Sequence, residues 1–367
     1  MANSTQAATR ELIDSDISVA STLPAGYYID PSIAKVELER IFSRSWQIAA
    51  RREQLAKPGD FITTELAGEQ VLVSRGINGE LRGFYNICRH RAGPPATGCG
   101  NRKVFRCGYH GWTYGLDGKL LNAPEMDGTQ NFRAEEFALR SVRTAEWALW
   151  VFVNLDPDAE DLIPALREVP SQASRFNLES MRLYERREYK LDCNWKVYVD
   201  NFLEGYHLPS VHPGLNKELD YSQYKTTTFE RHSVQSSPIR GPENEDTTKR
   251  RYKQSQGELS ADYFWIYPNW MLNCYPDNMS LNLVVPNGPE KTNIIFEWYF
   301  TDEVLKTDAP QQSVNFSDEI QLEDGHICEV VHRNLHSSSY DRGRYSVKQE
   351  KCVHHFHRLY AAMMSQL

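Results

Sequence analysis

The sequence of 367 residues contains no long hydrophobic run, no internal repeat and no low-complexity segment. A membrane-spanning helix needs about 18 or more consecutive apolar residues, and no stretch approaches that length. No stretch resembles a secretory signal peptide either. The chain also lacks an excess of positive charge, because 41 Lys and Arg face 49 Asp and Glu, for a net charge of -8. We therefore expect a cytoplasmic protein that binds neither membranes nor nucleic acids.

Cysteine is present but shows no pattern of disulfide pairing. The number is odd and the spacing is scattered, with residues at Cys88, Cys99, Cys107, Cys193, Cys274, Cys328 and Cys352. In a chain of this length such a distribution argues against a disulfide framework and favours a reducing compartment. Cys88 and Cys107 differ from the rest because each shortly precedes a histidine.

The pattern of hydrophobic residues and turns predicts an α+β fold in two parts. From 46 to 157 the sequence consists of short strands separated by turns, such as the two strands on either side of Asn78-Gly79, and predicts an all-β domain. The remainder, 158–367, predicts a sheet with long helices. Residues 1–45 form an N-terminal arm that we expect to pack with this larger domain. The expected helices are 161–176, 194–206, 311–336 and 349–364, with a polar, irregular segment at 220–256.

The all-β part contains two short segments that each carry one thiol and one imidazole. Cys88-Arg89-His90 and Cys107-Gly108-Tyr109-His110 are separated by residues 91–106. Tetrahedral zinc also uses two Cys and two His. Zinc fingers, however, more often pair Cys with Cys and His with His, and follow with a helix. One Cys and one His on each of two hairpin-like segments fits a [2Fe–2S] cluster, in which the cysteines hold one iron and the histidines the other.

Here the sequence resembles the Rieske proteins, whose motif is Cys-x-His followed by Cys-x-x-His. Gly111-Trp112-Thr113-Tyr114 also matches the version found in ring-hydroxylating oxygenases. Arg89 departs from the family pattern, because many members have proline there, but it is not a ligand position. The resemblance implies that Cys88, His90, Cys107 and His110 bind a Rieske cluster. We interpret Cys99, which lies between the pairs, as a structural thiol.

A second group of polar residues lies between 200 and 212. On a helix Asp200, Glu204 and His207 would share one face, and Pro209 would end that helix so that His212 approaches from a loop. Two imidazoles and one carboxylate form the facial triad of Fe(II) oxygenases, which leaves positions open for O2 and substrate. The alternative is two unrelated histidines. The close spacing of the pair, after a Rieske motif, favours the iron site.

The match to Rieske oxygenase alpha subunits covers most of the chain and implies further residues. The third iron ligand in the family is a distant Asp on a long helix, which points to Asp324, with Glu323 as the competitor that periodicity does not exclude. Glu204 stands where the family carries an acidic bridge between a neighbouring subunit's Rieske histidine and the iron. Such a bridge implies a head-to-tail ring, a trimer in this family. Asp200 is then expected to hold His207.

The resemblance is strongest to choline, glycine betaine and carnitine monooxygenases, which also have Glu at the bridge position. An aromatic stretch that includes Trp265, Tyr267 and Trp270 is therefore a candidate cage for a quaternary ammonium group. Ordinary core packing explains most of those side chains equally well. The histidines at 354, 355 and 357 are interpreted as part of a partly exposed terminal helix rather than as a metal site.

The resemblance implies a Rieske domain inserted in a helix-grip catalytic domain of the START/Bet v1 type. The expected function is that of a terminal oxygenase that hydroxylates or oxidatively demethylates a small quaternary ammonium compound of the betaine, choline or carnitine type. It would use a Rieske [2Fe–2S] cluster, a mononuclear Fe(II) and O2 as co-substrate. A separate flavin and iron–sulfur reductase would supply electrons from NAD(P)H, because no segment resembles a flavin or nicotinamide site. The alternatives are hydroxylation or O-demethylation of an aromatic substrate, and a Rieske electron carrier without mononuclear iron. Monooxygenation or dioxygenation, and trimer or hexamer, stay open.

Overall fold

The computed structural model describes residues 12–212, 214–215, 223–239 and 260–365. The chain folds as two compact units. The smaller unit is Glu37–Pro170, and the larger one combines the chain up to Val36 with Ser171–Leu367. The smaller unit is therefore an insertion in the sequence of the larger one, with limits somewhat wider than 46–157.

The smaller unit is built from antiparallel β-sheet. Its described residues form a seven-stranded sheet in the order β1-β10-β9-β4-β3-β2-β5 and a three-stranded sheet in the order β6-β7-β8. The predicted hairpin is confirmed as β3 and β4, with Gly79 in the left-handed region at φ 84°. The strands are β1 Gln47–Arg51, β2 Asp60–Leu66, β3 Glu69–Arg75, β4 Leu81–Tyr85, β5 Cys99–Asn101, β6 Val104–Arg106, β7 Thr113–Gly115, β8 Leu120–Asn122, β9 Ser141–Trp147 and β10 Trp150–Asn154.

Alternation along β3 divides the core of this unit into two clusters. Val71 and Val73 face a cluster that includes Val151 and Val153 of β10. Leu72 points the other way, into a second cluster that contains both Cys88 and Cys107. Because successive side chains of a strand point to opposite faces, one hydrophobic strand serves both clusters. The second cluster gives the two thiols a buried, apolar base.

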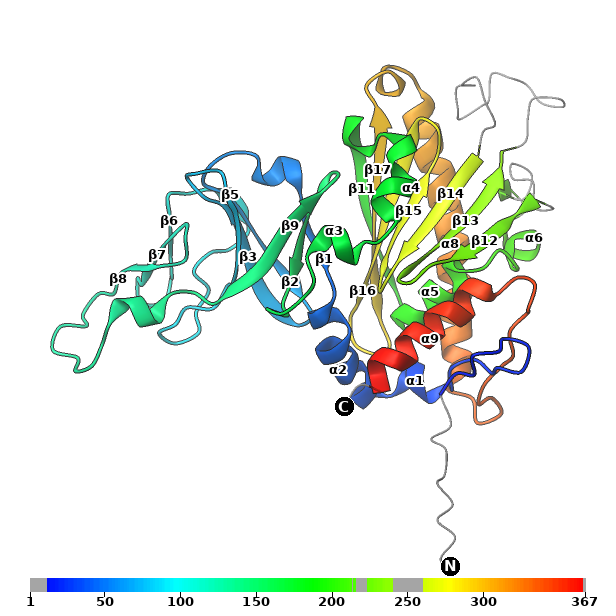
Figure 1. The fold of residues 1–367 in the computed structure, drawn as a ribbon, viewed down its shortest axis with the longest axis horizontal. Helices are drawn as coiled ribbons and strands as arrows, with labels where there is room; N and C mark the ends of the chain where they lie inside the picture. The colour runs from blue at the N-terminus through cyan, green and yellow to red at the C-terminus, as the bar shows by residue number, and fades with distance from the viewer. Residues whose placement is uncertain (1–11, 213, 216–222, 240–259, 366–367) are drawn as a thin grey trace, which may run out of the picture. The chain divides into compact units, whose positions relative to one another are not determined.

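The larger unit is an antiparallel sheet with helices packed against it. Its described residues form a seven-stranded sheet in the order β11-β17-β16-β15-β14-β13-β12, and the long helix α8 runs across the sheet (Figure 1). The strands are β11 Met181–Leu191, β12 Lys225–Thr228, β13 His232–Pro238, β14 Ser260–Ile266, β15 Trp270–Cys274, β16 Asn278–Pro286 and β17 Thr292–Thr301. The α+β pattern predicted from the sequence is confirmed.

Two of the four predicted long helices form as expected and two do not. The predictions at 311–336 and 349–364 correspond to α8, Ala309–Leu335, and α9, Lys351–Ser365. The segment 161–176 instead breaks into α3 Leu162–Ala165 and α4 Val169–Ala173, followed by a short 3-10 turn, because Arg167 adopts a positive φ of 52°. Within the described ranges no helix is both long and apolar enough to cross a bilayer.

The helix expected at 194–206 ends earlier than predicted. α5 covers Trp195–Phe202, and the Asn194 side chain caps its first turn by accepting a hydrogen bond from the Lys196 backbone at 3.0 Å. After a turn the chain enters α6, Leu208–Val211, in which Pro209 occupies the first turn. Pro209 therefore helps to start a helix rather than to end one, since that position needs no backbone donor. Two further α-helices, α1 Gly26–Ile29 and α2 Pro31–Arg40, lie near the start of the described chain.

Candidate active site with two metal centres

The two Cys/His segments lie in neighbouring loops of the smaller unit. Cys88 and His90 follow β4, while Cys107 and His110 lie between β6 and β7. Both thiols are buried, with 3% and 2% of their surface exposed, whereas both imidazoles are exposed. The His90 and His110 rings lie 4.5 Å apart between centroids. Each segment thus presents a buried sulfur and an exposed nitrogen, an arrangement suited to a cluster with one iron inside and one at the surface.

Neighbouring residues shape the space around the thiols. The Tyr114 hydroxyl lies 3.2 Å from Cys88 Sγ and accepts a hydrogen bond from the Arg89 backbone at 2.9 Å. At Gly93 a Cβ atom would come within 2.9 Å of Cys107 Sγ, so only glycine leaves this approach open. Burial raises the pKa of the Cys88 thiol. A bound iron would offset that effect, because coordination favours the thiolate.

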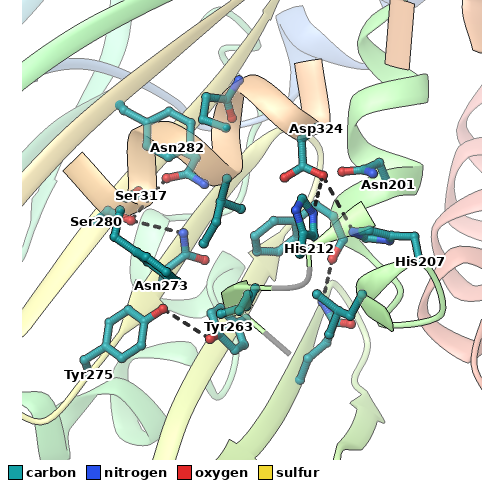
Figure 2. Close-up of a pocket in the computed structure, with 18 of the residues that line it drawn as sticks. Asn201, His207, His212, Tyr263, Asn273, Tyr275, Ser280, Asn282, Ser317 and Asp324 are labelled. Carbon is teal, nitrogen blue, oxygen red and sulfur yellow. Dashed lines mark hydrogen bonds and ion pairs between the residues drawn. The ribbon is translucent and has the colours of Figure 1, made fainter. Parts of the chain in front are cut away.

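In the larger unit the histidines of the second group meet one carboxylate of α8. His207 lies in the turn after α5, His212 caps the end of α6, and Asp324 lies within α8. Asp324 Oδ1 is 2.9 Å from His212 Nε2 and 3.6 Å from His207 Nε2. One donor atom from each residue lies within 4.8 Å of the others, and Figure 2 shows the three side chains converging. This donor set fits Fe(II), since two imidazoles and a carboxylate on one side leave coordination positions open.

Each of the two histidines also has a carboxylate at its other ring nitrogen, Nδ1. Glu204 Oε1 lies 2.5 Å from His207 Nδ1, and Glu323 Oε2 lies 2.6 Å from His212 Nδ1. A carboxylate at Nδ1 keeps the proton there and leaves Nε2 unprotonated for a metal. The structure thereby separates the two candidates on α8: Asp324 faces the Nε2 atoms and Glu323 faces Nδ1. The supporting role of Glu323 was not predicted from the sequence.

The structure differs from the sequence prediction in how Glu204 and Asp200 are used. Because α5 ends at Phe202, Glu204 and His207 lie in a turn, where Glu204 Oε2 also accepts the backbone N–H groups of Tyr206 and His207. Asp200 remains on the helix and does not hold His207. Its carboxylate instead accepts a hydrogen bond from Tyr28 and pairs with His357.

The electrostatics of the second group favour a bound cation. His212 is almost fully buried, at 1% exposed, and burial alone would lower its pKa. The hydrogen bonds and negative charges of Asp324 and Glu323 outweigh burial and leave the pKa of His212 raised. The imidazole therefore lies where positive charge is stabilised, and a metal ion would supply that charge in place of the proton.

A pocket of about 120 Å³ adjoins the triad. One row of inward-facing residues crosses five paired strands of the sheet and lines the pocket, namely Gln235, Tyr263, Asn273, Ser280 and Trp298. Figure 2 shows Tyr275, Ser280 and Asn273 at the side of the pocket away from Asp324, His207 and His212. The Tyr263 and Tyr275 rings pack edge to face, 6.0 Å apart. Apart from Glu204 and the triad, the pocket therefore combines aromatic and aliphatic surface with uncharged polar groups.

The aromatic residues predicted to line the pocket are not among its lining residues. Trp265 is fully buried against Phe356 of α9, and its indole N–H donates to the Pro268 carbonyl. Tyr267 packs on Trp265 at the end of β14, and Trp270 lies in the core with 1% of its surface exposed. Trp265 and Tyr263 share a face, but α9 covers the part of it that carries Trp265. Trp270, which pairs with Ile266, lies on the opposite face of the sheet. The prediction of these three residues as pocket lining is therefore wrong.

A third group with ligand-like spacing is better explained by hydrogen bonding. Donor atoms of Glu290, His332 and His336 lie within 4.8 Å of one another. His332 Nδ1 accepts the Asn194 backbone N–H at 3.4 Å, so the proton of a neutral His332 lies on Nε2 and is donated to Glu290 at 3.1 Å. That proton occupies the lone pair that a metal would need.

Comparison with known proteins gives matches over both units. Residues 45–133 match the Rieske [2Fe-2S] domain, and residues 178–366 match the catalytic domain of the ring-hydroxylating alpha subunit. The chloroplastic choline monooxygenase of Arabidopsis thaliana is 39% identical over 93% of this chain and 82% of its own length. The carnitine monooxygenase oxygenase subunit of Escherichia coli K12 is 32% identical over 93% of both chains.

A solved quaternary ammonium Rieske monooxygenase, studied for carnitine oxidation by gut microbiota, superposes with a TM-score of 0.85 at 29% identity. The superposition covers 95% of this chain and 97% of that structure. Naphthalene 1,2-dioxygenase from Rhodococcus matches with a TM-score of 0.77 at 21% identity, which shows a shared fold.

Proposed function

The chain belongs to the family of Rieske-type ring-hydroxylating oxygenase alpha subunits, and on that premise we propose that it oxidises a small quaternary ammonium compound. As an oxygenase of this family it uses a Rieske cluster, mononuclear iron and O2. The substrate class rests on one observation above the others. Away from Glu204 and the triad itself, aromatic side chains such as Tyr263, Tyr275 and Trp298 line the pocket, and aromatic faces suit the cation of a choline, betaine or carnitine.

Each ligand residue has a proposed role. Cys88 and Cys107 hold the inner iron of the Rieske cluster, and His90 and His110 hold the outer one. His207, His212 and Asp324 hold the mononuclear iron, which supplies O2 activation when it is bound. Glu204 and Glu323 orient the two imidazoles through their Nδ1 atoms, and this orientation fixes the direction of both Nε2 lone pairs.

Glu204 has a second proposed role in electron delivery. In the homotrimer that we propose, the Rieske histidine of a neighbouring subunit lies near Glu204, and the carboxylate couples the two imidazoles. The exposure of His90 and His110 supports this role, because a cluster edge at the surface can exchange electrons with another protein. The structurally similar carnitine-oxidising enzyme is described in terms of inter-subunit electron transfer.

Aromatic side chains in the pocket are the proposed cation site. Tyr263 and Tyr275, which are joined through their hydroxyls at 3.1 Å, replace the predicted tryptophans in this role. A trimethylammonium group binds aromatic faces and needs no hydrogen-bond acceptor, since it has no N–H. Hydroxylation of a carbon next to the nitrogen would give an aldehyde and an amine with one substituent fewer.

The electrons come from a separate NAD(P)H-dependent reductase in this proposal, because the sequence has no motif for a flavin or a nicotinamide. We also propose a cytoplasmic location. The seven free cysteines are consistent with a reducing compartment.

A substrate screen tests the proposal. The purified protein, supplied with a ferredoxin-type reductase and NADH, is offered choline, glycine betaine, carnitine and a set of aromatic carboxylic acids. We expect O2 consumption matched by product only with a quaternary ammonium compound. Matched product from an aromatic acid, and from none of the quaternary compounds, would replace the proposal with the alternative of aromatic hydroxylation or O-demethylation.

A further inference from the structure

A second cavity lies on the other side of the Glu204–His207 pair from the substrate pocket. This rear cavity has a volume of about 360 Å³, and its polar wall is made by Tyr28, Asp200, Glu204, Glu350 and His357. It can hold several water molecules, each of which occupies about 30 Å³ in the liquid.

The rear cavity and the substrate pocket share part of their walls. Asn201, Glu204 and His207 line both. The two cavities therefore meet at Glu204 and at His207, which is one of the three proposed iron ligands. A water molecule in the rear cavity can therefore approach Glu204 without passing through the substrate pocket.

A chain of short hydrogen bonds borders the rear cavity. Tyr345 Oη lies 2.6 Å from His357 Nδ1, His357 Nε2 lies 2.8 Å from Asp200 Oδ1, and Tyr28 donates to Asp200 Oδ2 at 2.7 Å. His357, which was expected on a partly exposed helix, is only 1% exposed. Asp200 lies on α5 four residues before Glu204. The iron-site mechanism uses none of these four side chains.

Glu350 is held in a fixed position at the same cavity. Its Oε2 accepts the Ser346 backbone N–H at 2.5 Å, and its own backbone N–H donates to the Ser346 carbonyl at 2.9 Å. Burial raises the pKa of Glu350, and the hydrogen bond from the Ser346 backbone N–H opposes this effect. The negative charges of Glu204 and Asp200 raise the pKa further, so that the net direction is upward. Glu350 thus keeps its proton to a higher pH than an ordinary glutamate and can release it on demand.

We propose that the rear cavity is the route by which protons reach the iron site, with Glu350 and Asp200 as the groups that load cavity water beside Glu204. The inference rests on the proposed function, because oxygenation creates the demand for protons. One turnover converts a substrate C–H, O2, two electrons from the reductase and two protons into C–OH and water. Both protons must come from solvent, since neither the substrate nor the reductase electrons supply them.

A purely structural network is the competing explanation for these contacts. The chain of Tyr28, Asp200, His357 and Tyr345 joins α1, α5 and α9, and such a clamp would stabilise the fold. A clamp needs neither the cavity nor Glu350. The decisive variant is therefore Glu350→Gln, which keeps the shape and the acceptor oxygen of the side chain and removes its ability to ionise. Glu303→Gln, at an exposed position in the same unit, is the matched control.

The first experiment uses iron-free protein and needs no turnover. In infrared spectra recorded as the pH is raised, wild type should contain the carbonyl stretch of a carboxyl group that stays protonated above the pH at which an ordinary glutamate ionises. The band should be missing in Glu350→Gln and present in Glu303→Gln. A wild-type spectrum equal to that of Glu350→Gln would overturn the assignment of Glu350.

The second experiment measures how much of the consumed O2 yields product, with the active substrate from the screen. Glu350→Gln should form product about a hundredfold more slowly and release peroxide instead, as expected when proton transfer is impaired. Iron content and substrate affinity should match wild type. Glu350→Ala should recover activity with added formate or acetate, which can enter the cavity. A ratio of product formed to O2 consumed within twofold of wild type in Glu350→Gln would overturn the proposed proton route, whichever substrate class the screen identifies.

Discussion

The two proposed metal centres differ in the sequence distance over which their ligands are gathered. The Rieske ligands come from two loops of one small β unit, between Cys88 and His110. The mononuclear site joins the turn after α5 to the middle of α8, so that His212 meets a carboxylate 112 positions further along the chain. The first centre depends on hairpins that form locally. The second depends on packing α8 against the sheet and α5.

Exposure follows the same division. His90 and His110 lie at the surface of their unit, whereas His212 is buried and has a carboxylate oxygen beside each ring nitrogen. An electron-accepting cluster needs an accessible edge. A centre that activates O2 needs an enclosed pocket and fixed ligands, because water and misplaced ligands allow side reactions. Each proposed centre thus has the exposure that its part of the reaction requires.

The largest expected effect is the loss of iron from one centre while the other centre keeps its iron. Cys107→Ser should remove about two irons per chain and the Rieske spectrum while leaving the mononuclear iron. His212→Ala should remove about one iron and leave the spectrum intact. Both variants should lose product formation by more than about a thousandfold, because the reaction needs both centres. Metal analysis with visible and EPR spectra would check this, and loss of both centres in either variant would show that they are not independent.

The next prediction distinguishes the two neighbouring carboxylates of α8. Asp324→Ala should lose the mononuclear iron. Glu323→Ala should keep it with about 10- to 100-fold weaker affinity, which is the usual cost of removing a carboxylate behind a histidine ligand. Fe(II) titration of the two variants after iron removal measures this difference. Equal losses of iron affinity in the two variants would contradict the assignment of Asp324 as the iron ligand and of Glu323 as the residue that orients His212.

A smaller effect is expected in the pocket. Tyr275→Ala should weaken binding of the active quaternary ammonium compound about tenfold, in line with the loss of one cation–π contact, while binding of an uncharged analogue of the same shape changes little. Tyr184→Ala, at a site 40% exposed and outside the pocket lining, serves as the control. Calorimetric titration gives both affinities, and equal weakening for charged and uncharged ligands would remove the cation site.

The smallest predicted effect is a change in pH dependence. Because Asp324 and Glu323 raise the pKa of His212 despite its burial, a proton competes with iron to a higher pH than at an ordinary histidine. Iron affinity should therefore fall as pH decreases through that raised pKa, by up to about tenfold per pH unit. In Glu323→Ala the fall should begin at lower pH, because one of the two charges is gone. Fe(II) titrations at several pH values measure the pH at which iron affinity begins to fall. The same pH in wild type and Glu323→Ala would contradict this cause.

The same division explains what could be predicted from the sequence. The Cys/His segments and the His207–His212 pair are local patterns, and α8, α9 and strands such as β3, β4 and β14 to β17 follow from periodicity. β12 and β13 lie in the segment that was expected to be irregular. The end of α5 was misplaced because the turn at 203–207 is fixed by Glu204, which accepts two backbone N–H groups rather than continuing the helix.

Residues whose positions depend on distant packing were not predictable in this way. Trp265 and Tyr263 lie on one face of β14, and only the placement of α9 decides that Tyr263 lines the pocket. Helical periodicity did not choose between Asp324 and Glu323, since the choice depends on which nitrogen of His212 each one meets. Asp200 was assigned to His207 because its true partners, Tyr28 and His357, are far away in the sequence.

The most direct test of two separate centres in one chain is the content of iron and acid-labile sulfide, combined with the EPR spectrum of the reduced protein. We predict about three irons and about two sulfides per chain, with a Rieske signal. About two irons, even after reconstitution with Fe(II), would contradict the assignment of His207, His212 and Asp324. Zinc without sulfide would contradict the assignment of Cys88, His90, Cys107 and His110, and with it the whole account.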